Sequence, residues 1–109
     1  MSEHLYEKAL KGLYACMEAC NRCFDACLRE ENTDMLTDCI RTNRECADMC
    51  ALMIKTIQSN SRYVSDLANV CSTICQDCAE ECLKHSHNHC QHCAEACTHC
   101  AKMCRELAS

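Results

Sequence analysis

Cysteines recur at intervals of three, four and seven residues along the chain, and this spacing places side chains on one face of an α-helix. A four-three-four spacing occurs twice, at Cys16, Cys20, Cys23 and Cys27 and again at Cys71, Cys75, Cys78 and Cys82. The other eight are Cys39, Cys46, Cys50, Cys90, Cys93, Cys97, Cys100 and Cys104. At about 100° per residue, each four-three-four set lies within a stripe of roughly 60°. A soluble helix turns such a stripe inward, so thiols are expected to fill the core.

The rest of the sequence favours long helices, because 109 residues include one Gly and no Pro. Helices are expected at about 3–30, 34–58, 62–84 and 88–107, with Ser2, Thr33, Ser61, and Ser86 or His87 as N-caps. The connections are short, so consecutive helices should be antiparallel neighbours. The predicted fold is all-α, an antiparallel up-down-up-down four-helix bundle with a Cys-lined core, forming one domain over residues 1–109.

Composition excludes several classes of protein. Disulfide scaffolds are usually secreted and rich in loops, whereas this chain begins MSEHLYEKALKG without an apolar signal segment, so a cytoplasmic location is expected. Charged and polar residues interrupt every hydrophobic run, which argues against a membrane partner. A net charge of −5 with few aromatic residues argues against nucleic acid.

Sixteen thiols in helical stripes indicate a soft-metal site. One or two buried cysteines would be ordinary core residues, but sixteen in place of larger residues would give up much hydrophobic burial. Zn²⁺ held by four thiolates leaves a net charge of −2, and the stripes contain no Lys or Arg to balance it. Cu(I) accepts two or three thiolates, and about one ion per thiolate makes the core neutral. We therefore expect all sixteen cysteines to bind multiple Cu(I) ions.

The two ends of the predicted bundle differ in character. One end gathers apolar residues without ligands: Leu5, Ala9, Leu13, Ile54, Ile57, Val64, Leu67 and Leu107. The other end gathers cysteines with His85, His87, His89 and Met35, and is the expected mouth for copper. His85 and His89 are the preferred additional ligands, because the helical wheel lets them lean toward the opening, and His87 and Met35 are further candidates. Asn43 occupies the gap between Cys39 and Cys46 and has no assigned role.

With these stripes in view, the chain resembles the cytosolic copper storage proteins. The resemblance covers essentially the full chain and is carried by CMEACNRCFDAC at 16–27, RECADMC at 44–50, CSTICQDCAEEC at 71–82 and KHSHNHCQHCAEAC at 84–97. It implies a homotetramer that admits Cu(I) near a His-bearing end. A cytosolic copper donor or acceptor is a further expected partner. The resemblance implies a storage role rather than an enzyme. Only three cysteines lie in the second helix, so the capacity is expected to be correspondingly smaller.

Three alternatives remain open on the sequence. A zinc or general soft-metal buffer would use the same thiolates, and competition between Zn²⁺ and Cu(I) separates the two. A thiol redox protein is suggested by Cys-x-x-Cys at 20–23 and 75–78, but the βαβ pattern typical of thioredoxin-like proteins is absent. A copper chaperone hands ions on and normally needs only one or two exposed thiols, whereas sixteen mostly buried thiols favour storage.

Overall fold

The computed structural model describes residues 3–108 and contains four α-helices and one short 3₁₀ helix. Their bounds are α1 Glu3–Arg29, η1 Thr33–Leu36, α2 Thr37–Gln58, α3 Val64–Cys82 and α4 Asn88–Ala108. The four predicted helices are therefore confirmed. The second begins three residues later than expected because 33–36 forms a 3₁₀ turn, and the third is shorter by two residues at each end.

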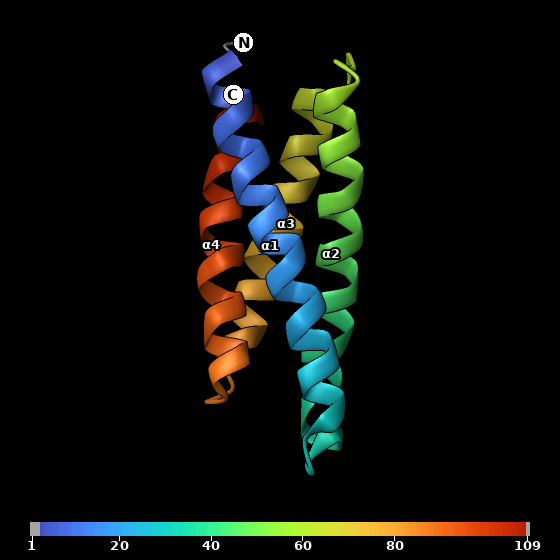
Figure 1. Cartoon of the computed structure of the whole chain (residues 1–109), viewed down its shortest axis with the longest axis vertical. Helices are drawn as coiled ribbons and strands as arrows, with labels where there is room; N and C mark the ends of the chain where they lie inside the picture. The colour runs from blue at the N-terminus through green and yellow to red at the C-terminus, as the bar shows by residue number, and fades with distance from the viewer. Residues whose placement is uncertain (1–2, 109) are drawn as a thin grey trace.

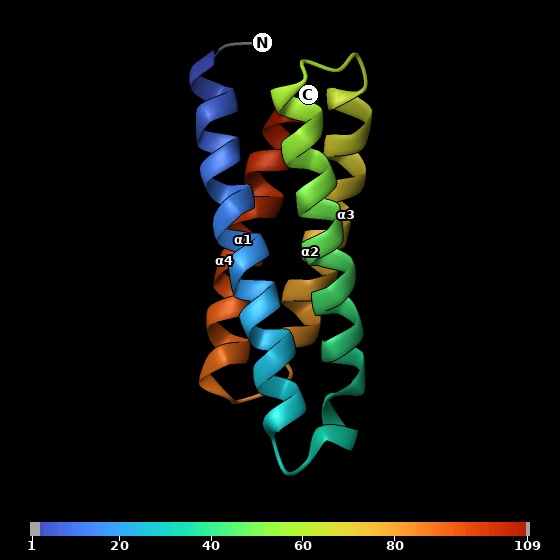
Figure 2. The same ribbon diagram turned by 45° about the vertical axis from the view of Figure 1, so that its right-hand side comes forward.

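The helices form an antiparallel bundle that measures 45 × 18 × 17 Å. In Figure 1, α1 and α3 run down the long axis while α2 and α4 run up it, so both chain ends lie at the same end of the bundle. Helix α1 packs against α2 and α4, and α3 packs against the same two. Figure 2 shows the connections α1–α2 and α3–α4 at the end opposite the termini. No helix among residues 3–108 combines the length and the apolar character that crossing a membrane requires.

The turn between α2 and α3 is fixed by backbone hydrogen bonds around Asn60, which has a left-handed φ of 54°. Ser61 N–H donates to the Thr56 carbonyl at 3.1 Å, and Asn60 N–H donates to the Ile57 carbonyl at 3.0 Å. This pair of bonds is the Schellman motif, which ends a helix and satisfies its last carbonyls. The chain therefore reverses within a few residues, and α3 returns beside α2.

Of the expected N-caps, His87 directly precedes α4 as predicted, whereas Thr33 and Ser61 do not hold that position for α2 and α3. The Thr33 hydroxyl donates to the Glu30 carbonyl at 2.7 Å, so it satisfies the end of α1 instead of starting α2. Ser61 Oγ accepts from Tyr63 N–H at 3.0 Å just before α3. Before α4, the His87 backbone carbonyl accepts from Cys90 and Gln91, both at 3.0 Å. Ser2 lies outside the described residues.

Apolar side chains close the end of the bundle that carries the chain termini, as predicted. The buried members are Ala9, Leu13, Ile54, Ile57, Val64 and Leu107, with Leu5 and Leu67 partly buried against them. The sulfurs occupy the core between this plug and the opposite end. The fold thus leaves one end of the sulfur core next to polar side chains and seals the other.

Candidate metal centre

All sixteen cysteines lie in the core as free thiols, and each is 0% exposed. They come from all four α-helices, so every helix contributes one stripe to the same interior. The packing of α1 and α3 against α2 and α4 brings the four stripes together along the bundle axis. The sequence prediction of a thiol-filled core is confirmed.

The sulfurs are organised as overlapping sets whose members lie within 4.8 Å of one another. Five of these sets are Cys23 with Cys27, Cys39 and Cys90; Cys23 with Cys82 and Cys93; Cys20 with Cys78, Cys93 and Cys97; Cys16 with Cys20, Cys46 and Cys97; and Cys16 with Cys46, Cys50 and Cys75. Neighbouring sets share Cys23, Cys93, Cys20 or Cys16. A continuous series of sulfur sets therefore runs from the His-bearing end into the core, and we call it the sulfur ladder.

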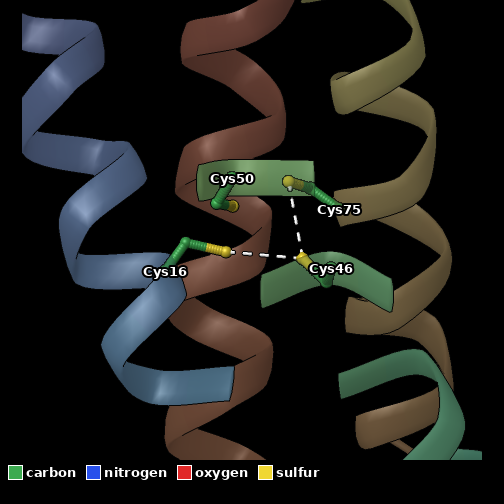
Figure 3. A group of neighbouring side chains, drawn as sticks. All are labelled: Cys16, Cys46, Cys50 and Cys75. Atoms are coloured by element: carbon green, nitrogen blue, oxygen red, sulfur yellow. Dashed lines mark hydrogen bonds between the residues drawn. The ribbon is translucent and has the colours of Figure 1, made fainter. Parts of the chain in front are cut away.

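Sulfur–sulfur distances within the ladder suit a shared soft ion. Figure 3 shows Cys16 of α1, Cys46 and Cys50 of α2, and Cys75 of α3 pointing toward one another. Cys46 Sγ lies 3.6 Å from Cys16 Sγ and 3.7 Å from Cys75 Sγ. A metal–sulfur bond of about 2.3 Å in trigonal geometry places sulfurs about 4 Å apart. Small side-chain movements would therefore bring three sulfurs onto one ion, whereas a disulfide of about 2.05 Å would need a much closer approach.

The charge around the ladder favours a monovalent ion. Among residues 3–108, the buried polar or charged side chains are Asn43, Thr56 and Ser72, so no buried Lys or Arg offsets thiolate charge. One Cu(I) per thiolate adds no net charge to the core, whereas divalent ions in four-thiolate sites would leave it strongly negative. The arrangement suits Cu(I) better than Zn²⁺.

Asn43 is fully buried and contacts sulfurs from three helices. Its Oδ1 accepts from the thiols of Cys93 at 3.4 Å, Cys78 at 3.5 Å and Cys82 at 3.7 Å. Its Nδ2 donates to Cys39 Sγ at 3.8 Å. Asn43, to which the sequence analysis assigns no role, is therefore the hydrogen-bonding centre of this part of the ladder.

His89 lies at the mouth of the ladder, and its Nδ1 contacts three sulfurs. The distances are 3.5 Å to Cys23 Sγ, 3.5 Å to Cys90 Sγ and 3.9 Å to Cys27 Sγ. On the other side of the ring, Nε2 lies 2.8 Å from Glu30 Oε2. Of the histidines and methionine proposed as extra ligands, His89 is the one that the structure brings to the sulfurs by these contacts.

The other proposed extra ligands lie in different surroundings. His85 Nε2 pairs with Glu81 Oε2 at 3.0 Å. The His87 ring stacks on the His89 ring with centroids 5.2 Å apart. Met35 is 73% exposed and lies on η1, outside α2, although the helix expected at 34–58 included it. The 3₁₀ turn is the reason, since three residues per turn change the direction of its side chains relative to α2.

Burial raises the pKa of Cys27 and Cys90 at the mouth, whereas hydrogen bonds with Cys39, Cys82 and Cys93 lower the pKa of Cys23. Removal from water raises the pKa of Cys27 to about 11 from an ordinary value of 9.0, and the nearby Cys23 adds to this effect. Burial likewise raises the pKa of Cys90, with further contributions from Cys23 and Cys27. Burial lowers the pKa of His89, but hydrogen bonds to Cys23 and Glu30 outweigh it and the net shift is upward. A metal ion that binds these thiols must therefore displace their protons.

Comparison with known proteins gives a consistent result. A curated relative, the uncharacterized cysteine-rich protein YhjQ of Bacillus subtilis (strain 168), is 45% identical over 88 residues, which are 81% of this chain and 82% of the relative. The solved structure of the Cu(I)-bound copper storage protein BsCsp3 is 45% identical, with a TM-score of 0.93, and the match covers 96% of this chain and 99% of that one.

A second group of solved structures comes from a cytosolic copper storage protein of Streptomyces lividans. The forms loaded with five coppers and with 10 copper equivalents are both 35% identical, with TM-scores of 0.92. Each match covers 96% of this chain, and it covers 92% and 84% of the respective structures. Finally, residues 2–109 match the sequence profile described as copper storage protein. With the buried sulfur ladder and these matches taken together, the chain belongs to the copper storage protein family.

Proposed function

We propose that this protein stores Cu(I) in the cytosol, holding multiple ions on the thiolates of its bundle core. The observation that carries this function is the core of sixteen fully buried thiols, which no buried cation accompanies among residues 3–108. Cu(I) is cargo here, because the fold provides many equivalent soft ligands. The family is one of copper storage, which implies a non-enzymatic role.

The sixteen cysteines are the proposed ligands, with His89 as the nitrogen ligand at the mouth. The contacts of His89 Nδ1 with Cys23, Cys27 and Cys90 support this role. His85 and His87 are proposed to lie beside the mouth without being required for storage. Glu81 pairs with His85, and the His87 ring stacks on the His89 ring. Met35 is not among the proposed ligands, because its side chain is largely exposed.

Copper is proposed to move inward by ligand exchange. An ion captured at the mouth by Cys23, Cys27, Cys90 and His89 can pass to sets that share Cys23 and then Cys93. Successive sulfurs are close enough that a new sulfur can bind before the old one leaves, for example Cys93 to Cys20 at 3.7 Å and Cys20 to Cys97 at 3.6 Å. Each thiol that binds releases a proton, so loading weakens as the pH falls.

A homotetramer is proposed as the assembled form, with a cytosolic copper donor or acceptor as a transient partner. The support is the resemblance of the sequence to the family and exposed apolar side chains such as Leu52, which is 47% exposed. The Arg44 guanidinium lies over the Phe24 ring at 5.1 Å from its centroid, which leaves less of that ring for contact between subunits. Sedimentation velocity of the apo and loaded protein tests this assembly, and a monomer in both states would contradict it.

Competition between metals tests the choice of Cu(I) over a zinc or general soft-metal buffer. The reduced protein is first loaded with Zn²⁺, and Cu(I) is then added anaerobically while a zinc-selective dye reports released Zn²⁺. We expect complete displacement of Zn²⁺ and a Cu(I) content above the Zn²⁺ content. Retention of Zn²⁺ in the presence of excess Cu(I) would favour the zinc buffer.

A further inference from the structure

Glu30 lies directly beyond the end of α1 and faces the imidazole rings at the mouth of the sulfur ladder. Its Oε2 is 2.8 Å from His89 Nε2 and 3.6 Å from His87 Nε2. An acidic side chain at the C-terminal end of a helix opposes the helix dipole, so helix stability does not explain a carboxylate at this position. The contact with His89 offers another explanation.

The two nitrogens of His89 face opposite surroundings. Nε2 meets the Glu30 carboxylate, which accepts hydrogen bonds and has no proton of its own to give when ionised. In the neutral imidazole, the carboxylate therefore keeps the proton on Nε2 and leaves Nδ1 with its lone pair. Nδ1 is the nitrogen that faces Cys23, Cys27 and Cys90. The free lone pair thus points at the sulfurs that form the outermost set of the ladder.

The His89 ring is also held from the side. The His87 ring stacks on it with an interplanar angle of 28° and a centroid distance of 5.2 Å. The side chains of Glu30, His87 and His89 are 32%, 26% and 21% exposed, so the three lie between solvent and the fully buried sulfurs. An ion that reaches the ladder at this end meets His89 in an orientation set by its two neighbours.

We propose that Glu30 is a positioning residue for copper capture, which fixes the Nε2–H tautomer and the orientation of His89 so that Nδ1 binds the first Cu(I) together with the mouth thiolates. The inference rests on the proposed storage function and deepens it. A carboxylate behind a metal-binding histidine makes the imidazole a better ligand, and its removal typically weakens metal binding 10- to 100-fold. Glu30 does not touch the inner sulfurs, so total capacity should not depend on it.

Three variants test the role of Glu30. Glu30→Leu removes both the hydrogen-bond acceptor and the charge, whereas Glu30→Gln keeps an acceptor oxygen and removes only the charge. Glu31→Leu is the matched control, because Glu31 is the adjacent exposed acid and carries the same charge. Helical circular dichroism and total Cu(I) content are measured on every variant.

The first readout is the ¹⁵N chemical shifts of the His89 ring in the reduced apo protein, and the second is the rate of capture of one equivalent of Cu(I) from a chelated donor. We expect widely separated nitrogen shifts in the parent, Glu30→Gln and Glu31→Leu. In Glu30→Leu the shifts should move toward each other as tautomers mix, and capture should slow about tenfold at unchanged capacity.

Two results would overturn the inference. One is a Glu30→Leu variant with the nitrogen shifts and capture rate of the parent, and the other is equal slowing in Glu31→Leu, which would make the effect one of net charge. Either result leaves storage intact. By contrast, a parent protein that binds only one or two Cu(I) ions would count against the proposed function itself.

Discussion

Raising the pH should destabilise the apo protein, because most of its buried thiols, Cys27 among them, hold their protons more tightly when the chain is folded. Cys27 is fully buried, and its pKa is about 11 in the folded protein against an ordinary 9.0. Between these values the unfolded chain releases a proton that the folded chain keeps, so unfolding becomes more favourable as the pH rises. At pH 10 this difference amounts to about 1.4 kcal/mol from Cys27 alone.

Copper reverses the direction of this pH dependence. A sulfur bound to Cu(I) carries no proton in the folded protein, whereas an unfolded chain that has released copper is protonated below about pH 9. Stability of the loaded protein should therefore rise with pH up to about 9. The loaded protein is therefore expected to gain stability from neutral pH up to about 9, whereas the apo protein is expected to lose stability from about pH 9 to 11.

Thermal unfolding under anaerobic, reducing conditions at pH 7.5 and pH 10 measures this effect. The apo protein should lose on the order of 5 °C in Tm for the Cys27 contribution, with more from Cys90, whose pKa is also raised. The variant Cys27→Ala should lose about 1.4 kcal/mol less over the same pH interval. An apo Tm that does not fall, or an equal fall in Cys27→Ala, would refute the assignment of raised thiol pKa values at the mouth.

Three further predictions concern single residues of the core. Cys46→Ser removes a sulfur shared by two sets of the ladder and should lower the Cu(I) content by about one to two ions, as measured by metal analysis after gel filtration. Asn43→Cys completes the spacing of α2 and should raise the content by about one ion; an unchanged content would show that Asn43 already occupies a ligand position. Leu13→Ala, in the fully buried apolar plug, should cost the apo protein about 3 kcal/mol in urea unfolding without changing the Cu(I) content, and a lowered content would mean that the plug also shapes the metal core.

The bundle and its thiol core could be predicted because both depend on periodicity. Four cysteines in a 60° stripe specify which face of a helix is buried, whatever the details of its neighbours. The same reasoning failed at Met35, because the helix expected at 34–58 treated the residues before Thr37 as α-helical. The 3₁₀ turn there breaks the phase, and Met35 is 73% exposed.

Contacts between single residues of different helices could not be read from the sequence. Glu30 belongs to no repeat, and its role appears only when α1 and α4 bring it within 2.8 Å of His89. The only available signal was an acid at a helix C-terminus, where the dipole disfavours it. Asn43 stood out as a gap in the cysteine stripe, but its three sulfur donors come from α3 and α4, and only the packing of the bundle brings them together.

The central claim is tested most directly by anaerobic titration of the reduced apo protein with Cu(I) against a competing chelator. Thiolate-to-copper absorbance and helical circular dichroism are followed together. A preformed store on sixteen thiols should saturate well above four ions per chain, at about one ion per thiolate, with unchanged helicity. Saturation at one or two ions would contradict storage and leave a chaperone or a thiol redox protein as the better description.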